Sequence, residues 1–137
     1  MSVVQICTVL CIEDDQDDLF LFTRAFEQAT IPCEIHSVSS AEQARYYLLG
    51  KGSYSDRQRF PLPDLIVTDL ALRAECGLVF LNWMRDQPAF AAIKVLCLTG
   101  SDDPQRIRQI RDLGISVIEK TSRFEEAVGF IGKLPLQ

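Results

Sequence analysis

Five polar residues stand at the ends of apolar runs in this 137-residue chain: Glu13, Asp14, Asp69, Thr99 and Lys120. An aspartate carboxylate can accept a phosphoryl group and form a covalent acyl phosphate. Because the incoming group is negatively charged, bringing it among three acids requires a divalent cation such as Mg²⁺, which prefers hard oxygen ligands. A lysine ammonium and a threonine hydroxyl can hold the phosphate oxygens. Each residue also has a plainer explanation, as a solvated strand end, a surface lysine or a turn former, and only a common position in the fold favours a shared site.

The apolar runs before these residues predict short strands. The run Leu65–Leu70, which follows prolines 61 and 63, is typical of a strand buried on both faces, as in a parallel sheet. Asp69 then lies at its carboxyl end, which is the edge where ligands bind in open parallel sheets. The other predicted strands are Thr8–Ile12, Cys33–Val38, Lys94–Leu98 and Ile115–Glu119. Of these, Cys33–Val38 alternates like a half-buried edge strand.

Helical patterns alternate with the strands and end in recognisable caps. The predicted helices are Asp17–Ala29, Ser39 to Leu49, Gly77–Gln87 with Leu78, Leu81 and Met84 on its buried face, Asp103 to Leu113, and a last helix from Ser122. Five strands and five helices in alternation predict an α/β fold, with a doubly wound parallel sheet covered on both faces. Residues 1–137 are expected to form it as one domain.

Composition narrows the class of protein. The formal net charge of −5 argues against a nucleic-acid partner, because phosphate backbones bind to basic faces. The five cysteines are odd in number and form no C-x-x-C pair, which favours a reducing, cytoplasmic setting. The apolar N-terminus has no basic segment before it, so it is expected to be a strand and not a signal peptide. No run of residues approaches the length of a membrane span.

The acidic run from residue 13 to residue 18 contains five acids in six positions. Asp15, Asp17 and Asp18 are explained as the cap and first turn of the following helix, where the helix dipole favours negative charge. Glu13 and Asp14 lie earlier, at the strand end itself. These two acids are therefore the better candidates for a site.

The arrangement resembles the receiver domain of two-component response regulators over roughly Thr8 to Leu134. The family's paired acids, phosphoacceptor, hydroxyl, lysine and a glycine match Glu13 and Asp14, Asp69, Thr99, Lys120 and Gly77. The resemblance implies a flavodoxin-like sheet with strand order 2-1-3-4-5, flanked by five helices. A narrower similarity, in the loop from Tyr54 to Pro63, is to the stand-alone regulators associated with phytochrome-type sensor kinases.

The resemblance also implies a function. Asp69 would take a phosphoryl group from a sensor histidine kinase or a phosphotransfer protein, and the domain would then signal by docking to a partner protein. Asp14 and Asp69 would bind Mg²⁺ directly, and Glu13 would bind it through water. The backbone carbonyl of Ala71 would complete the protein ligands. Such a domain catalyses only its own modification and is not a metabolic enzyme, and the family also admits a homodimer through the fourth helix.

Several residues depart from the family pattern. Leu72 and Arg73 replace a usual Met-Pro, and Thr121 replaces a proline, where a cis peptide bond would now cost about 3 kcal/mol. Val117 stands in the place of the aromatic residue that usually reports phosphorylation. We therefore expect output to rely on movement of the Thr99 loop and the fourth helix. The alternative is a receiver-like module that binds its partner whether phosphorylated or not.

Two residues beside the expected position of the attacking water suggest that the acyl phosphate would be long-lived. Ala71 and Ser101 replace the larger polar residues frequent in the family, so slow autodephosphorylation is expected. Ala71 also argues against a phosphatase of the haloacid dehalogenase type, which needs a second aspartate at that position. A flavin-binding relative would need a phosphate-cradling loop after the first strand, and that loop is acidic here.

Overall fold

In this computed structural model, the described residues are 6–29, 32–70, 76–100 and 103–119, together with Gly129 and Lys133. Helices and strands alternate along them. The strands are β1 (Cys7–Ile12), β2 (Cys33–Val38), β3 (Leu65–Asp69), β4 (Lys94–Thr99) and β5 (Ser116–Glu119). The α-helices are α1 (Gln16–Gln28), α2 (Ala41–Leu49), α3 (Gly77–Arg85) and α4 (Pro104–Asp112), with short 3-10 turns η1 (Gly52–Tyr54) and η2 (Pro88–Phe90).

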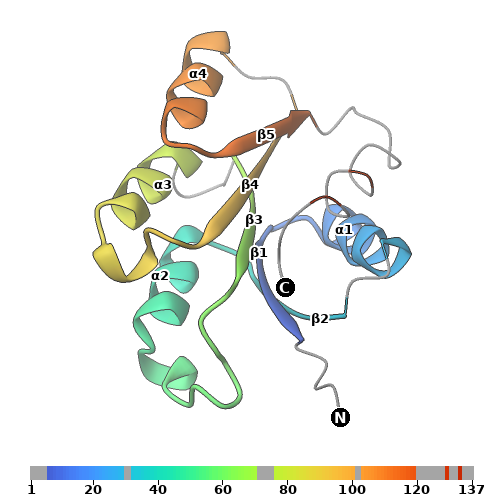
Figure 1. Cartoon of the computed structure of the whole chain (residues 1–137), viewed down its shortest axis with the longest axis vertical. Coiled ribbons are helices and arrows are strands. Elements are labelled where there is room, and N and C mark those ends of the chain that lie inside the picture. Colours follow the sequence, from blue (N-terminus) through green and yellow to red (C-terminus); the bar gives the residue numbers. More distant parts are fainter. Residues whose placement is uncertain are drawn as a thin grey trace.

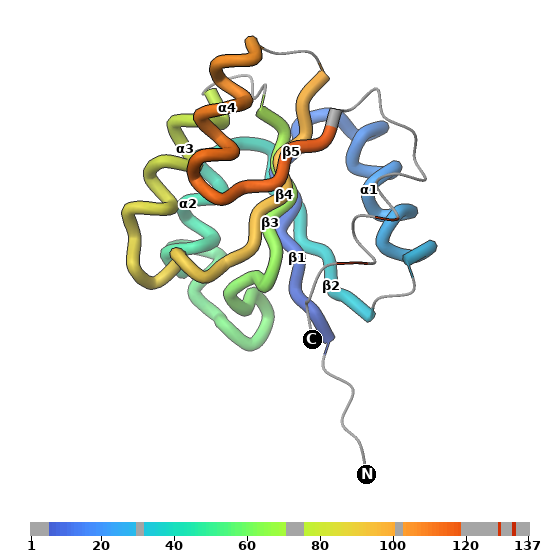
Figure 2. Tube along the Cα trace, turned by 45° about the horizontal axis from the view of Figure 1, so that its top comes forward, coloured from blue at the N-terminus to red at the C-terminus, as the bar shows by residue number. Residues whose placement is uncertain are grey.

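The five strands form one parallel sheet in the order β2-β1-β3-β4-β5. Helix α1 covers one face of the sheet, and α2, α3 and α4 cover the other (Figure 1). The tilted view in Figure 2 shows the same two layers on either side of the central strands. The predicted doubly wound sheet and its strand order are thus confirmed. Four α-helices lie within the described residues, and nearly all of the helix predicted from Ser122 lies outside them.

The central strands are buried on both faces, as their unbroken apolar sequences predicted. Alternate residues of β1 point to opposite sides: Leu10 and Ile12 join the core under α2, α3 and α4, while Val9 and Cys11 join the core under α1. Phe26 of α1 fills the second core. Because both faces are covered, the carboxyl edge of the sheet is left as the place where polar groups can gather.

The cysteines behave as small apolar residues. All five are free thiols, and Cys7, Cys11 and Cys97 are buried in strands. Burial raises the pKa of the Cys11 thiol to about 12, so this thiol is protonated at neutral pH. In the part of the chain that the structure describes, no helix has the length and apolar character needed to cross a bilayer.

The predicted helix starts are confirmed by their hydrogen bonds. The Asp15 side chain caps α1 and accepts from the backbone N–H groups of Asp17 and Asp18. Ser40 caps α2 by accepting from the Gln43 N–H, and Asp103 caps α4 ahead of a proline. Side-chain caps fix where a helix begins, because they satisfy N–H groups that have no partner within the helix.

The buried face of α3 differs in part from the prediction. Leu81 and Met84 are fully buried as expected, but Leu78 is only partly buried and Phe80 is completely buried. The reason is the neighbouring helix α2, whose Arg45 lies over the Phe80 ring at 5.7 Å from its centroid. A helix covered by both the sheet and another helix buries a wider stripe than its sequence alone suggests.

The segment between α2 and β3 is attached to the fold by side-chain hydrogen bonds. Arg57 donates to the backbone carbonyls of Tyr47 at 2.8 Å, Leu48 at 2.6 Å and Phe60 at 3.2 Å. The Tyr47 hydroxyl donates to the Pro61 carbonyl at 2.9 Å. The guanidinium therefore satisfies carbonyls at the end of α2 and ties the segment to it just before β3 begins.

Candidate functional site

Three of the predicted site residues end or follow neighbouring strands at the carboxyl edge of the sheet. Asp69 ends β3, Thr99 ends β4, and Glu13 follows β1. All three side chains are buried, with exposed fractions of 5%, 2% and 5% respectively. Since Ile12 pairs with Thr68 in the parallel register, Glu13 lies level with Asp69 on the adjacent strand.

Glu13, Asp18 and Asp69 form a compact group of acids. One carboxylate oxygen from each lies within 4.8 Å of the others. At an effective dielectric constant of about 20, two negative charges at that separation repel by about 3 kcal/mol. A divalent cation between the three oxygens would turn that repulsion into attraction, and carboxylate oxygens are the ligands such cations prefer.

The turn from β1 into α1 fixes Glu13 and Asp18 in place. The Glu13 N–H donates to the Val38 carbonyl at 3.0 Å, and Glu13 Oε1 accepts from the Asp15 N–H at 3.1 Å. Asp15 in turn caps α1. Glu13 and Asp18 therefore lie at the amino end of α1, where the helix dipole favours negative charge.

Asp14 occupies a partly buried position within this turn, and its Oδ2 is shielded from solvent. It is not a member of the three-acid group. Its assignment as a direct metal ligand stays a prediction.

Asp18 is the residue that sequence reasoning left out of the site. The sequence explained it as a first-turn residue of α1, and the structure confirms that position. It also brings the Asp18 carboxylate to Glu13 and Asp69, which the sequence did not predict. The sequence signal that could have indicated this role is the excess of acids. Five acids in six positions are more than helix capping and the helix dipole explain.

Gly77 brings α3 against the end of β3. A Cβ atom at this position would lie 3.0 Å from both the Cα and the carbonyl oxygen of Leu70, and 3.1 Å from the carbonyl oxygen of Asp69. The Gly77 N–H donates to the Leu70 carbonyl at 3.0 Å, and the Leu70 N–H donates to the Leu98 carbonyl at 2.9 Å. Only glycine, which has no Cβ, permits this close approach. Gly77 therefore allows α3 to pack against the backbone that carries Asp69.

Thr99 lies one step further along the same edge. It pairs in register with Glu119, the last residue of β5. Two other predicted site residues, Ala71 and Lys120, lie outside the described residues, as do Leu72, Arg73, Ser101 and Thr121. Val117 is described, and it packs partly buried against the larger core.

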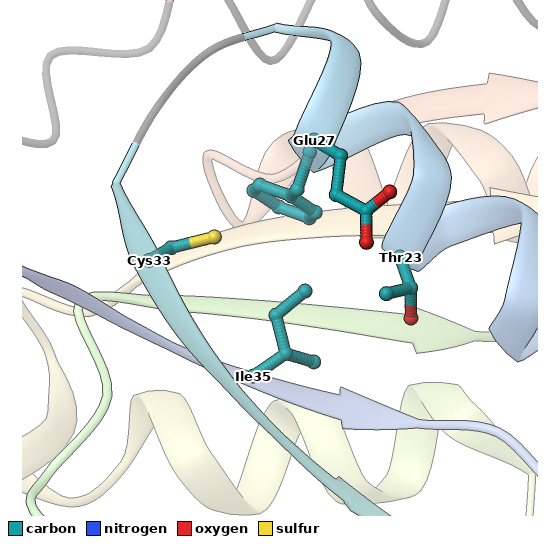
Figure 3. Close-up of a pocket in the computed structure, with 5 residues that line it drawn as sticks. Thr23, Glu27, Cys33 and Ile35 are labelled. Carbon is teal, nitrogen blue, oxygen red and sulfur yellow. The ribbon is translucent and has the colours of Figure 1, made fainter.

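A separate hollow of about 250 Å³ lies between α1 and β2, lined by Thr23, Phe26, Glu27, Cys33 and Ile35 (Figure 3). Cys33 begins β2 and Glu27 is in the last turn of α1, so this hollow is at the opposite end of these elements from the acids. The Thr23 hydroxyl already donates to the Leu19 carbonyl at 3.0 Å. The hollow therefore adds nothing to the chemistry of the acidic site.

A parallel sheet in this order, with acids at the carboxyl ends of β1 and β3 and a hydroxyl at the end of β4, defines a receiver-type fold. Residues 9–131 match the response regulator receiver domain family, and the chain belongs to that family. It is thus a receiver domain of the kind found in response regulators of two-component phosphorelay systems. No curated protein sequence matches it at a significant level.

The chain is similar in sequence and structure to solved response regulators whose names refer to red light or phytochromes. It is 25% identical to response regulator RPA3017 in red light signalling of R. palustris, covering 93% of this chain and 90% of that one, with a TM-score of 0.82. It is 26% identical to the phosphorylated cyanobacterial phytochrome response regulator RcpA, covering 93% and 90%, with a TM-score of 0.80. It is 28% identical to the bacteriophytochrome response regulator RtBRR, covering 97% and 80%, with a TM-score of 0.82.

Proposed function

We propose that this protein is a stand-alone response regulator that accepts a phosphoryl group on Asp69 from a sensor histidine kinase. The observation that carries the proposal is the grouping of Glu13, Asp18 and Asp69 within 4.8 Å at the carboxyl edge of a receiver sheet. Burying an aspartate among other acids is unfavourable unless a positive charge compensates their negative charge. Once a divalent cation balances that charge, the Asp69 carboxylate is a suitable phosphoryl acceptor.

The transfer has a simple chemical balance. A carboxylate oxygen of Asp69 attacks the phosphorus of a partner's phosphohistidine, and the phosphorus–nitrogen bond breaks. The electron pair of that bond stays on the histidine nitrogen, and the product is an acyl phosphate on Asp69. The protein contributes mainly position and charge, because phosphoryl transfer has a loose transition state. Thr99, at the same edge, supplies a hydroxyl that can donate to a phosphoryl oxygen, and Lys120 supplies a positive charge in this proposal.

Receiver domains bind a divalent metal, and the residues present here fit one. Glu13, Asp14, Asp69 and the Ala71 carbonyl are the ligands that we assign to it, with Mg²⁺ as the ion. When bound, the ion neutralises the negative charge that gathers as the phosphoryl group arrives. The donors are all oxygens, which suits Mg²⁺ better than it suits softer metals.

The relatives suggest which kinase is involved. The three structures reported above are named for red-light, phytochrome and bacteriophytochrome signalling, and RcpA was solved in its phosphorylated form. A phytochrome-type histidine kinase is therefore the proposed phosphoryl donor. Free cysteines agree with the cytoplasmic location that this partner implies.

In this proposal the protein is not a metabolic enzyme, and its output is phosphorylation-dependent docking to another protein. One observation favours a second candidate, a module that docks independently of phosphorylation. Val117 pairs in register with Cys97 in the middle of β4, where an aromatic side chain would be needed to report phosphorylation by moving inward. A valine has no ring that could move in this way.

Incubation with acetyl phosphate and Mg²⁺ tests the proposal. Intact mass spectrometry should show one added phosphoryl group, and a Phos-tag gel should show the matching shift. Asp69→Asn is the control and should show neither. A wild-type protein that stays unmodified under conditions that label a known receiver would leave only the phosphorylation-independent docking module.

A further inference from the structure

We infer that Asp18, in the first turn of α1, is a carboxylate of the metal site and ties helix α1 to the bound cation. The inference rests on the proposed function, because it concerns the same site. It adds a residue that lies outside the strand-end acids of the family pattern. It also gives α1 a part in metal binding, whereas the sequence assigned it only a structural part.

The geometry supports this assignment. The Asp18 carboxylate comes within 4.8 Å of both the Glu13 and the Asp69 oxygens, so the three can share one cation without a change of fold. Each oxygen comes from a different element: the β1 end, the first turn of α1 and the end of β3. A cation needs ligands from several directions, and only Asp18 among these supplies one from the helical layer.

The neighbouring residue Asp17 shows that this placement is specific. Both aspartates belong to the first turn of α1, and both donate their backbone N–H to the Asp15 side chain, at 2.8 Å for Asp17 and 3.3 Å for Asp18. The Asp17 side chain is exposed to solvent and is not in the acid group, whereas Asp18 is partly buried and is in it. The two residues therefore have the same cap and lie in the same helix dipole. They differ in that only the Asp18 carboxylate lies beside Glu13 and Asp69.

The added carboxylate of Asp18 changes what the metal site does. The extra negative charge raises affinity for a divalent cation, because affinity of oxygen sites grows with ligand charge. It also makes the metal a link between α1 and the sheet edge. We therefore expect cation binding to protect the backbone amides at the start of α1 from hydrogen exchange, even in the absence of any phosphoryl donor.

The test compares Asp18→Asn with Asp17→Asn. Both variants remove one negative charge from the same helical turn and leave the Asp15 cap intact. Calorimetric titration with Mn²⁺ and with Mg²⁺ should show a loss of affinity of about tenfold or more for Asp18→Asn, the size that removing a supporting group around a metal typically causes. Asp17→Asn should stay within about twofold of wild type, since it alters only screened, exposed charge.

Hydrogen exchange of the wild-type protein gives an answer that does not depend on any variant folding. Adding Mg²⁺ should slow exchange in the peptide that covers residues 16–20, and should leave the start of α4 unchanged. Equal metal affinity of the two variants, or no added protection of residues 16–20, would overturn the inference while leaving the proposed function in place. A wild-type protein that binds no divalent cation and takes no phosphoryl group would instead overturn the proposed function itself.

Discussion

Substituting Gly77 by alanine should disturb the site through the backbone alone. Gly77 begins α3, and its Cα faces the backbone at the end of β3. An added Cβ would meet the Cα and carbonyl oxygen of Leu70 at 3.0 Å and the carbonyl oxygen of Asp69 at 3.1 Å. These are backbone atoms at the buried end of a parallel strand, where the Leu70 N–H is bonded to the Leu98 carbonyl, so they cannot swing aside as a surface side chain would.

The expected size follows from two opposing effects. The new atom would sit about 0.4 Å inside the 3.4 Å lower limit of ordinary contact, and overpacking of this kind costs about 1–3 kcal/mol. Alanine is better than glycine by up to about 1 kcal/mol in a helix interior, and it gains less than that at Gly77, the first residue of α3. The net loss in the free energy of unfolding should therefore be about 1–2 kcal/mol. For a chain of this length that corresponds to a fall in Tm of roughly 3–8 °C.

The assay is thermal unfolding alongside the rate of labelling by acetyl phosphate. Because the clash involves the carbonyl of Asp69 itself, labelling of Gly77→Ala should slow several-fold even at temperatures where the variant is fully folded. Gly129→Ala is the control, since a Cβ there meets nothing within 4 Å. Because Gly129 is helical and exposed, alanine there should leave Tm unchanged or raise it, and it should leave the labelling rate unchanged. A Gly77→Ala protein with wild-type Tm would refute the argument that this close approach requires glycine.

Three further predictions concern the rest of the chain. Arg57→Gln should lower the free energy of unfolding by about 2–3 kcal/mol, because charge-assisted bonds to partly buried carbonyls are lost, while substitution of the exposed Arg108 by glutamine should change it by less than about 0.5 kcal/mol in the same urea titration. Burial raises the pKa of Cys11 to about 12, above that of an unfolded thiol, so its contribution to stability is complete below about pH 8.5 and is lost as the pH rises toward 12. The urea midpoint should therefore fall between about pH 8 and pH 10.5, and less so in Cys11→Ala. The acyl phosphate should persist for minutes or longer once donor is removed, because Ala71 and Ser101 offer no carboxamide to orient water, and loss within seconds would contradict this.

Much of the fold could be predicted because its signals are local. A short apolar run such as Leu65–Asp69 predicts a doubly buried strand, and Ser40 or Asp103 marks a helix start by its own side-chain bond. Strand-end acids could be gathered at one edge by topology alone, because all carboxyl ends of a parallel sheet meet there. The structure has Glu13, Asp69 and Thr99 at this edge, as that rule predicts.

The features that escaped prediction depend on how elements turn toward one another. Whether Asp17 or Asp18 reaches the site is set by the rotation of α1 about its axis, which packing of Phe26 against the sheet decides. The burial of Phe80 depends on Arg45 of the adjacent helix, and the order of the segment before β3 depends on Arg57 reaching carbonyls nine and ten residues away. None of these contacts leaves a periodic or capping signal in its own stretch of sequence.

The way the acids are held bears directly on the proposed chemistry. Glu13 is fixed by bonds to Val38 and Asp15, Asp18 by a capped helix, and Asp69 by a buried strand. Three carboxylates on a flexible loop would relax their mutual repulsion by moving apart, but carboxylates on a sheet edge and a capped helix cannot do so without breaking backbone bonds. The fold therefore keeps the acids close before any cation arrives, and the cation gains the attraction of all three without having to order the site.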